Sequence, residues 1–365
     1  MKIDAFDYKR GLSEIDDEIY ESIKDFLNSG KLILGTQVEK FENDFSLFVG
    51  CKYGVGVNSG TDAIKIALRA LGVTEGDEVI TVPNTAVPTV SAIRELGAIP
   101  KFVDVGDDYN IDVNKIEVVI NSKTKVIMPV HLYGKPCNMK KIMRIAKKHK
   151  LLVVEDCAQA HGAKIGNRFV GSFGIISCFS FYPTKNLGAY GDGGLIVTNS
   201  KKLAEKCKMS RAYGMKKTYY ANIEGYNSRL DEIQAAILNV KLKHLNEYNN
   251  GRRSNANCYL KNIVNKNIVL PKVGILDDHC FHQFVIRVKN RDKFIEYLKS
   301  KEIGFGIHYP FPIHIQKAYK FLNYKRSDFP KTMNFSKEII SLPIFPELKA
   351  DELKYIVSCL NEYKA

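Results

Sequence analysis

The sequence predicts an α/β protein with a large domain on a mainly parallel sheet and a smaller C-terminal α+β domain. Between about residues 54 and 200, short runs rich in Val and Ile alternate with helix-type patterns, as in sheets covered on both faces. A long helix pattern follows, and after it short strand and helix patterns mix without a repeat. A chain of 365 residues has room for two such domains.

The first part of the chain supplies the predicted sheet. Strands are expected at residues 78–82, 101–103, 125–129, 151–155, 175–181 and 195–198. Helices are expected at residues 61–71, 86–97, 138–149 and 201–211. In such a sheet, ligands collect outside the carboxyl ends of the strands.

A long helix is predicted to begin near Asn227 and Ser228, because apolar residues recur at helical spacing after them. We expect it to end near Tyr248, where Asn-Asn-Gly follows, and we place the domain boundary there. The predicted domains are a large one, residues 1–248, and a small one, residues 249–365. In the second domain we expect a strand at 283–288 and helices at 291–300 and 336–340.

Composition narrows the function classes. Lys and Arg total 54 and Asp and Glu 40, a net charge of +14, but the basic residues are scattered and form no nucleic-acid motif. No pair among the eight cysteines has C-x-x-C spacing, so we expect neither a metal site nor disulfides. We find neither a secretory signal nor an apolar run long enough to span a membrane. We therefore expect a cytoplasmic protein that binds neither nucleic acid nor membrane.

Lys185 is the first candidate catalytic residue. A strand-like run ends at Pro183-Thr184, and Lys185 follows at once in a glycine-rich loop. Among aromatic residues the amine would lose hydration, which lowers its pKa and makes it a nucleophile able to form a Schiff base. Taken alone, an exposed loop lysine is the commoner interpretation, and it is the neighbouring motifs that favour the catalytic one.

Two adjacent carboxylates, Glu155 and Asp156, follow the buried strand residues 151–154. Adjacent strand residues point to opposite faces, so only one of them should face a given site. A carboxylate there could hold a pyridine nitrogen protonated and keep a cofactor ring electron-poor. Alone, such a pair is more often a helix cap or a surface pair.

Residues 58–63 (NSGTDA) open a helix with small side chains and unpaired backbone N–H groups, which is a natural phosphate site. Gly54, Gly56 and Gly60 do not match the dinucleotide fingerprint, because their spacing is G-x-G-x-x-x-G and no acidic residue marks a ribose site. A phosphate site, a strand-end carboxylate and a loop lysine in this order predict a pyridoxal phosphate site.

Six segments carry a family resemblance: GVNSGTDA, GDEVI, PVHLYG, EDCAQAHGA, FSFYPTKNLGAYGDGG and GYNSRLDEIQAAIL. Together they closely resemble the nucleotide-sugar aminotransferases, the DegT/DnrJ/EryC1/StrS family of fold-type I pyridoxal phosphate enzymes. The resemblance covers nearly the whole chain. It implies the cofactor pyridoxal 5'-phosphate and a homodimer with active sites at the subunit interface.

The resemblance also implies roles for the residues around the cofactor ring. Lys185 would hold the cofactor covalently and later move the proton. Asp156 would pair with the pyridinium nitrogen, and Gln159 would lie by the ring near its 3-hydroxyl.

The phosphate, by the same resemblance, would be bound by the backbone N–H groups of Gly60 and Thr61, by the Ser180 hydroxyl and by the partner subunit's Asn227. The alternative for Ser180 is an ordinary strand serine. The alternative for Asn227 is a helix N-cap, a common role for asparagine.

The chain departs from the family pattern at Ala86. In many members an aromatic residue of a T-[FYW]-x-A-T segment stacks on the cofactor ring, whereas residues 85–89 here are TAVPT. Either another side chain covers the ring, or the small residue leaves room for a different sugar pose.

The resemblance favours ordinary transamination, because the deoxygenating relatives carry a histidine in place of Lys185. The expected reaction moves an amino group from L-glutamate to a keto-sugar on a nucleoside diphosphate. Residues 304–314 (GFGIHYPFPIH) resemble the branch that aminates C3 of thymidine-diphosphate 3-keto-6-deoxyhexoses. Tyr182, His308 and Tyr309 would then contact the sugar, although His308 could simply be a loop histidine.

Two alternatives remain open. A similar H-Y-x-P-x-H motif occurs in aminotransferases that act on C4 of UDP-, GDP- or dTDP-4-keto-6-deoxyhexoses. A different class, a non-catalytic binding or regulatory protein on the same fold, is disfavoured by the intact set of Lys185, Asp156 and Ser180.

Overall fold

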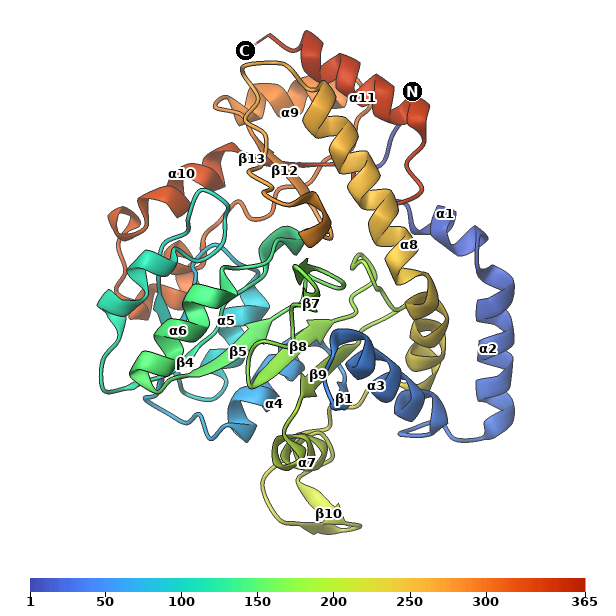
Figure 1. Cartoon of the computed structure of the whole chain (residues 1–365), viewed down its shortest axis with the longest axis vertical. Coiled ribbons are helices and arrows are strands. Elements are labelled where there is room, and N and C mark those ends of the chain that lie inside the picture. Colours follow the sequence, from blue (N-terminus) through green and yellow to red (C-terminus); the bar gives the residue numbers. More distant parts are fainter. Residues whose placement is uncertain (365) are drawn as a thin grey trace.

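The computed structural model describes residues 1–364 and contains a sheet of seven strands in the order β1-β9-β8-β5-β4-β2-β3 (Figure 1). Neighbouring strands pair in parallel from β3 to β8, whereas β9 is antiparallel to both β8 and β1. The prediction of a mainly parallel sheet is confirmed. The strands are β1 (Tyr53–Val57), β2 (Glu78–Thr81), β3 (Ile99–Phe102), β4 (Thr124–Ile127), β5 (Leu152–Asp156), β8 (Ile176–Ser180) and β9 (Gly194–Thr198).

Strand β1 was not among the six strands expected. Its sequence, YGVGV, carries two glycines, which weaken a strand pattern. The fold needs Gly54 because a Cβ there would lie 2.3 Å from the backbone oxygen of Glu42. A close helix–strand contact therefore explains a residue that local propensity disfavours.

Helices cover both faces of the sheet, and the strand side chains alternate accordingly. In β8, Ile176 and Cys178 join the core under α4 (Gly60–Ala70) and α7 (Lys201–Ser210), while Phe179 joins the core under α3 (Thr36–Val49). Because successive side chains of a strand point to opposite faces of the sheet, the apolar residues of β8 contribute to two separate cores. The three helices expected between the strands and the one expected after the last strand are all present, including α5 (Val87–Arg94) and α6 (Met139–His149).

The long helix α8 (Glu232–Asn262) differs from the prediction at both ends. It begins after Asp231 rather than at Asn227, and it continues through Asn249–Asn250–Gly251. Tertiary contacts outweigh helix propensity here. The Asn249 amide donates to the backbone oxygen of His161 at 2.8 Å, and a Cβ on Gly251 would already touch Pro346 at 3.0 Å.

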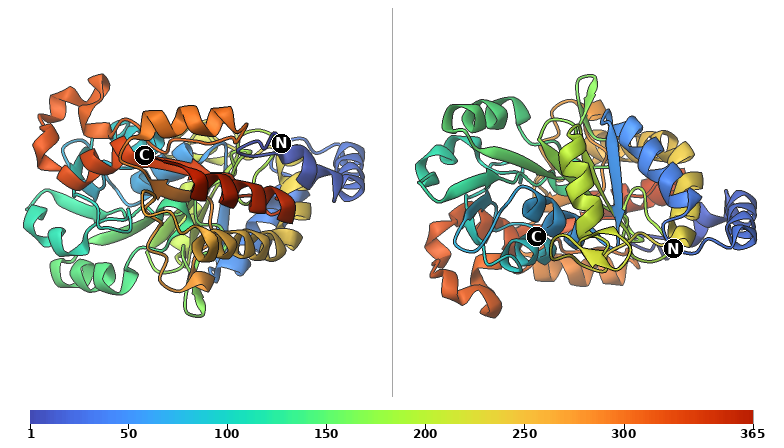
Figure 2. Two further views of the ribbon diagram at one scale, coloured as in Figure 1. Left: turned by 90° about the horizontal axis from the view of Figure 1, so that it is seen from above. Right: turned by 90° about the horizontal axis from the view of Figure 1, so that it is seen from below.

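The C-terminal elements pack around the C-terminal end of α8. They lie above the sheet in Figure 1 and in front of it in the left view of Figure 2, which looks down from above. An antiparallel pair joins β12 (Phe284–Arg287) to β13 (Ile339–Leu342). Helix α9 (Arg291–Ser300) matches its prediction, whereas the segment expected as a helix at 336–340 ends α10 (Pro330–Glu338) and begins β13. The last helix is α11 (Ala350–Glu362). The division at residue 248 stays a prediction.

At the N-terminus, α1 (Tyr8–Ser13) and α2 (Asp16–Ser29) lie along the outside of α8 (Figure 1). Small strand pairs are β6 (Lys164–Ile165) with β7 (Arg168–Phe169), and β10 (Met215–Lys217) with β11 (Tyr220–Ala221). Short 3₁₀ turns occupy Val113–Lys115, Glu117–Val119, Leu132–Gly134, Leu276–Asp278, Ile313–Ile315, Lys317–Leu322 and Arg326–Asp328. No helix of the described residues is both long and apolar enough to cross a membrane.

Candidate active site

A cavity of about 260 Å³ lies at the carboxyl ends of β5 and β8. Parallel strands place the residues that follow them at one edge of the sheet, so motifs far apart in sequence meet there. Ala86, the departure from the family pattern, also lines this cavity. Its wall includes seven of the ten predicted site residues: Gly60, Thr61, Asp156, Gln159, Ser180, Tyr182 and Lys185.

Lys185 lies in the loop after β8, where its amide N–H donates to the Tyr182 oxygen at 2.8 Å. Burial of the amine lowers its pKa to about 8, although the Asp156 charge opposes this. A lysine with this pKa is partly neutral near physiological pH, and only the neutral amine is a nucleophile or a base. Lys185 is half-buried, and the lowered pKa agrees in direction with the predicted loss of hydration.

Asp156 is the carboxylate that faces the cavity. It is 2% exposed, and its Oδ2 accepts a hydrogen bond from Thr89 Oγ1 at 2.8 Å while Oδ1 accepts from the Ala158 amide at 3.1 Å. Burial raises the pKa of Asp156, and these two hydrogen bonds together with the Lys185 charge act in the opposite direction. No cation of the described residues lies within 4.0 Å of this carboxylate. A cationic partner placed in the cavity would therefore be held strongly.

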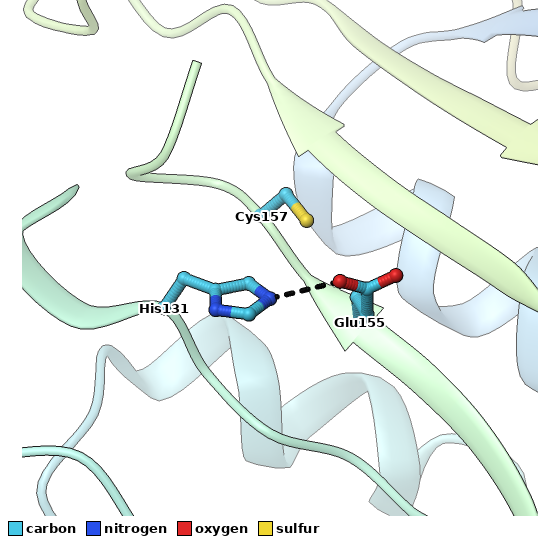
Figure 3. A group of neighbouring side chains, drawn as sticks. All are labelled: His131, Glu155 and Cys157. Carbon is cyan, nitrogen blue, oxygen red and sulfur yellow. Dashed lines mark hydrogen bonds and ion pairs between the residues drawn. The ribbon is translucent and has the colours of Figure 1, made fainter. Parts of the chain in front are cut away.

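Strand alternation places Glu155 on the opposite side of β5 from Asp156. Figure 3 shows Glu155 facing His131. It accepts a hydrogen bond from His131 Nε2 at 3.1 Å and others from the backbone of residues 171–174. Cys157 completes a buried group of metal-ligating side-chain types. However, His131 Nδ1 accepts from the Cys137 amide, and burial raises the pKa of the Cys157 thiol well above its usual value. These groups are committed to structural hydrogen bonds or protonated, and so they do not form a ready cation site.

The start of α4 forms the opposite end of the cavity. Ser59 caps this helix by accepting from the Asp62 amide at 3.1 Å, which leaves the amides of Gly60 and Thr61 among the first N–H groups without an intrahelical partner. A Cβ on Gly60 would come within 2.6 Å of Ser180 Cβ. Glycine thus lets the Ser180 side chain and the helix start converge, as an anion site requires.

Gln159 connects this cavity to the small-domain loop that carries His308 and Tyr309. Its Nε2 donates to Tyr309 Oη at 2.9 Å, and its Oε1 accepts from the Tyr133 amide at 2.7 Å. Tyr133 in turn donates its hydroxyl to the His308 backbone oxygen. His308 lines the neighbouring cavity rather than this one, and its Nδ1 lies 2.8 Å from Ser341 Oγ.

Two predicted residues, Tyr309 and Asn227, line neither cavity, and Asn227 has no hydrogen-bond link to a cavity residue of the kind that Tyr309 has with Gln159. Asn227 is exposed, and its backbone pairs with Ala212 in an isolated bridge. The helix-cap alternative is wrong, because the N-cap position of α8 is Asp231. The next residue, Ser228, is tied to α4 by donating to Asp62 Oδ2 at 2.7 Å. The exposed Asn227 therefore stays available to another chain.

Thr89 is a site residue that we did not predict. It follows Ala86 by three positions in the TAVPT segment, and its hydroxyl lies 2.8 Å from both Asp156 Oδ2 and Thr85 Oγ1. The sequence pattern drew attention to this segment only for the aromatic residue that it lacks. Its two threonines were the available signal, because buried hydroxyls need partners.

The fold and the cavity together define a class: an α/β enzyme with a reactive lysine, a buried carboxylate and a helix start around one site. A model of the DegT/DnrJ/EryC1/StrS aminotransferase family matches residues 13–361, and the chain belongs to this family. Both the predicted family and the predicted fold class are confirmed. The protein is therefore a pyridoxal phosphate-dependent aminotransferase of fold-type I.

Three relatives illustrate the match. A dTDP-3-amino-3,6-dideoxy-alpha-D-galactopyranose transaminase of Aneurinibacillus thermoaerophilus is 46% identical, over 95% of this chain and 95% of its own. A "pleiotropic regulatory protein" of Geobacillus stearothermophilus is 43% identical, over 100% of this chain and 99% of its own. The crystal structure of DesV of S. venezuelae, in complex with a ketimine intermediate, superposes with a TM-score of 0.97 at 37% sequence identity. The match covers 99% of this chain and 98% of the DesV chain.

The residues present fit pyridoxal phosphate. The buried carboxylate of Asp156 has no cationic partner in the described residues, and a pyridinium nitrogen would supply one. Gly60 keeps open a cradle of N–H groups that suits a phosphate, since a side chain there would fill it. Lys185 lies on the wall of the same cavity as both groups.

Proposed function

We propose that this enzyme transfers an amino group from L-glutamate to C3 of a dTDP-3-keto-6-deoxyhexose. One observation carries the proposal: the cavity that holds Lys185 and Asp156 is joined, through Gln159 and Tyr309, to the loop predicted to contact the sugar. The names of relatives such as the Aneurinibacillus transaminase support C3 as the position of the amine. The alternative is amination at C4 of a 4-keto-sugar.

The reacting groups of the chain have distinct roles in this proposal. The cofactor, when bound, provides an electron-poor ring that withdraws electrons from the carbon carrying the amino group. The carboxylate of Asp156 keeps the ring nitrogen protonated, and Thr89 holds that carboxylate in place. Lys185 binds the cofactor covalently at rest and, once released, its amine removes and returns a proton at the reacting carbon of each substrate.

The remaining predicted residues bind and orient. The amides of Gly60 and Thr61 and the hydroxyl of Ser180 would hold the phosphate, and Gln159 would lie by the ring near its 3-hydroxyl. Ala86 leaves one face of the ring less covered than an aromatic side chain would.

His308 and Tyr309, together with Tyr182, contact the sugar from the small-domain side of the site. Tyr182 is 54% exposed, so its hydroxyl can reach a bound substrate.

Asn227 completes the phosphate site from the partner subunit of a homodimer. Support comes from the exposed apolar side chains at the turn before α3 and at the β10–β11 hairpin, because such patches favour burial against another protein surface. Leu32 is 59% exposed and Tyr219 96% exposed. The enzyme works in the cytoplasm, where its eight free cysteines stay reduced.

The test is product identification. The cofactor-loaded enzyme, first converted by L-glutamate to its amino form, is supplied in parallel with 3-keto and 4-keto sugars linked to dTDP or UDP. We expect NMR of the dTDP-3-keto product to place the new amine at C3. Clean amination at C4, with no turnover of the 3-keto compound, would contradict the choice of carbon while leaving the aminotransferase activity intact. Absence of a visible cofactor band and of any turnover would favour the regulatory alternative.

A further inference from the structure

A second cavity, of about 210 Å³, lies on the small-domain side of the Lys185 loop. Its wall includes Thr184, Arg252, His282 and His308. Arg252 also lines a narrower space whose wall includes Lys185 itself. Arg252 and Lys185 therefore line one continuous space.

The guanidinium of Arg252 is buried without a directly paired carboxylate, although Glu347 lines the same narrower space. The residue is 3% exposed, and its Nη1 donates to the backbone oxygens of Ile344 at 2.5 Å and Phe281 at 3.4 Å. No carboxylate of the described residues lies within 4.0 Å, and the nearby Glu347 is no exception. A buried charge without such a partner is costly, so proteins rarely keep one without a use.

One edge of this guanidinium has no hydrogen-bond partner among the described residues. Nε is buried and has no partner, and Nη2 makes no hydrogen bond with the described residues. Nε and Nη2 lie side by side and present two parallel N–H donors, which is the arrangement that a carboxylate matches. Nη1, held by the two backbone oxygens, fixes the orientation of that edge.

The rest of the cavity wall mixes apolar residues with polar residues that carry no charge. His282 Nδ1 lies 3.2 Å from Asn186 Oδ1, and His308 Nδ1 lies 2.8 Å from Ser341 Oγ. Burial lowers the pKa of His308 to about 4 and that of His282 well below its usual value, so both rings are neutral near pH 7. Arg252 is thus the charged group of this wall, and it suits a ligand with a single negative charge at that point.

We propose that Arg252 binds a carboxylate of the amino-acid donor. The inference rests on the proposed function, because an amino acid that reacts beside Lys185 must place its carboxylates within a few ångströms of the lysine. Lys241 also lines the narrower space, but its amine already donates to the Gly188 backbone oxygen at 2.6 Å, whereas one edge of Arg252 has no partner. The sugar substrate carries its negative charge on the diphosphate and has no need of this arginine.

The experiment compares the two half-reactions in the holoenzyme. Arg252→Gln is tested beside Arg253→Gln, a control on the same helix whose side chain donates to His279 and Asn250 and lies outside both cavities. The first half-reaction, with L-glutamate, is followed by the loss of the cofactor band. The second is followed with the amino form of the enzyme and the keto-sugar. Calorimetry with 2-oxoglutarate and the amino form of the enzyme gives donor-side affinity without turnover.

We expect Arg252→Gln to lower kcat/KM for L-glutamate and the affinity for 2-oxoglutarate by about 10- to 100-fold, the usual value of a charge-assisted hydrogen-bond pair. The sugar half-reaction should change less than about threefold, and Arg253→Gln should resemble the wild type. An equal loss with L-alanine would assign the contact to the α-carboxylate, and an unchanged L-alanine rate to the side-chain carboxylate.

Equal losses in both half-reactions, or none in the first, would overturn the role of Arg252. If Arg252→Gln fails to fold, Arg252→Lys keeps the charge but loses the paired donors. An unchanged L-glutamate rate in that variant would likewise refute the proposal. Failure of the wild-type enzyme to react with any amino donor would instead refute the proposed function.

Discussion

Replacing each of the adjacent carboxylates Glu155 and Asp156 by its amide should separate stability from catalysis. The two residues are neighbours on β5 and both are buried, at 0% and 2% exposure. Their side chains nevertheless face opposite sides of the strand and accept hydrogen bonds from different groups. The two amide substitutions are therefore matched in chemistry and differ only in where they act.

Glu155→Gln should destabilise the fold. Glu155 Oε1 accepts from the amides of Phe173 and Gly174 and from Ser177 Oγ, and Oε2 accepts from the Gly171 amide and His131 Nε2. A glutamine nitrogen accepts no hydrogen bond, and the orientation with the fewest losses leaves the two Oε2 donors unpaired. Each buried unpaired donor costs about 1–3 kcal/mol, so the free energy of unfolding should fall by about 2–6 kcal/mol.

Asp156→Asn should leave the fold nearly unchanged. The asparagine oxygen can still accept from the Ala158 amide, and its NH₂ can donate to the Thr89 hydroxyl. That hydroxyl can then donate to Thr85, so both hydrogen bonds survive. The loss in unfolding free energy should stay below about 1 kcal/mol, whereas turnover should fall steeply because the negative charge beside the ring nitrogen is gone.

The assay is urea unfolding of the cofactor-free proteins, at one protein concentration, together with transamination turnover of the loaded proteins. Near-wild-type stability of Glu155→Gln with a steep fall in its turnover would refute the assignment of the two faces of β5. So would a mild effect of Asp156→Asn on turnover.

Three further predictions concern Lys185 and Asn227. Lys185→Ala should fold, lose the visible band of the bound cofactor and lose at least about 10²–10⁴-fold in turnover; near-normal turnover of the purified variant would end the assignment. In cofactor-free protein, the Lys185 amine should lose its proton near pH 8, because burial favours the neutral form. Cyanate labelling of Lys185, followed by mass spectrometry, should therefore rise with pH to half its maximum near pH 8, and a midpoint near 10 would contradict the burial effect. Mixing Lys185→Ala with Asn227→Ala subunits should restore activity, since some heterodimers then hold one intact site; no recovery despite proven subunit exchange would place both residues in one chain's site.

The sequence alone determined the class of fold and the position of the reactive groups along it. Strand and helix periodicities are local, so β4, β5, β8, α4 and α6 fall close to their predicted ranges. Parallel strands bring their carboxyl ends to one edge, which is why the strand pattern by itself predicts that Asp156 and Lys185 share a site. The family resemblance then supplied the cofactor and most of the binding residues.

Only the tertiary structure decided which groups meet from distant parts of the chain. The alternation of side chains along a strand predicts that Glu155 and Asp156 point to opposite faces of the sheet. Which of the two lines the cavity depends on the helices and loops that pack on each face. Helix α8 continues through Gly251, where the backbone packs closely against Pro346. Among the described residues Arg252 has no carboxylate within 4.0 Å, which only the packing of the surrounding elements decides. These outcomes arise from contacts between residues remote in sequence, and a local pattern carries no information about them.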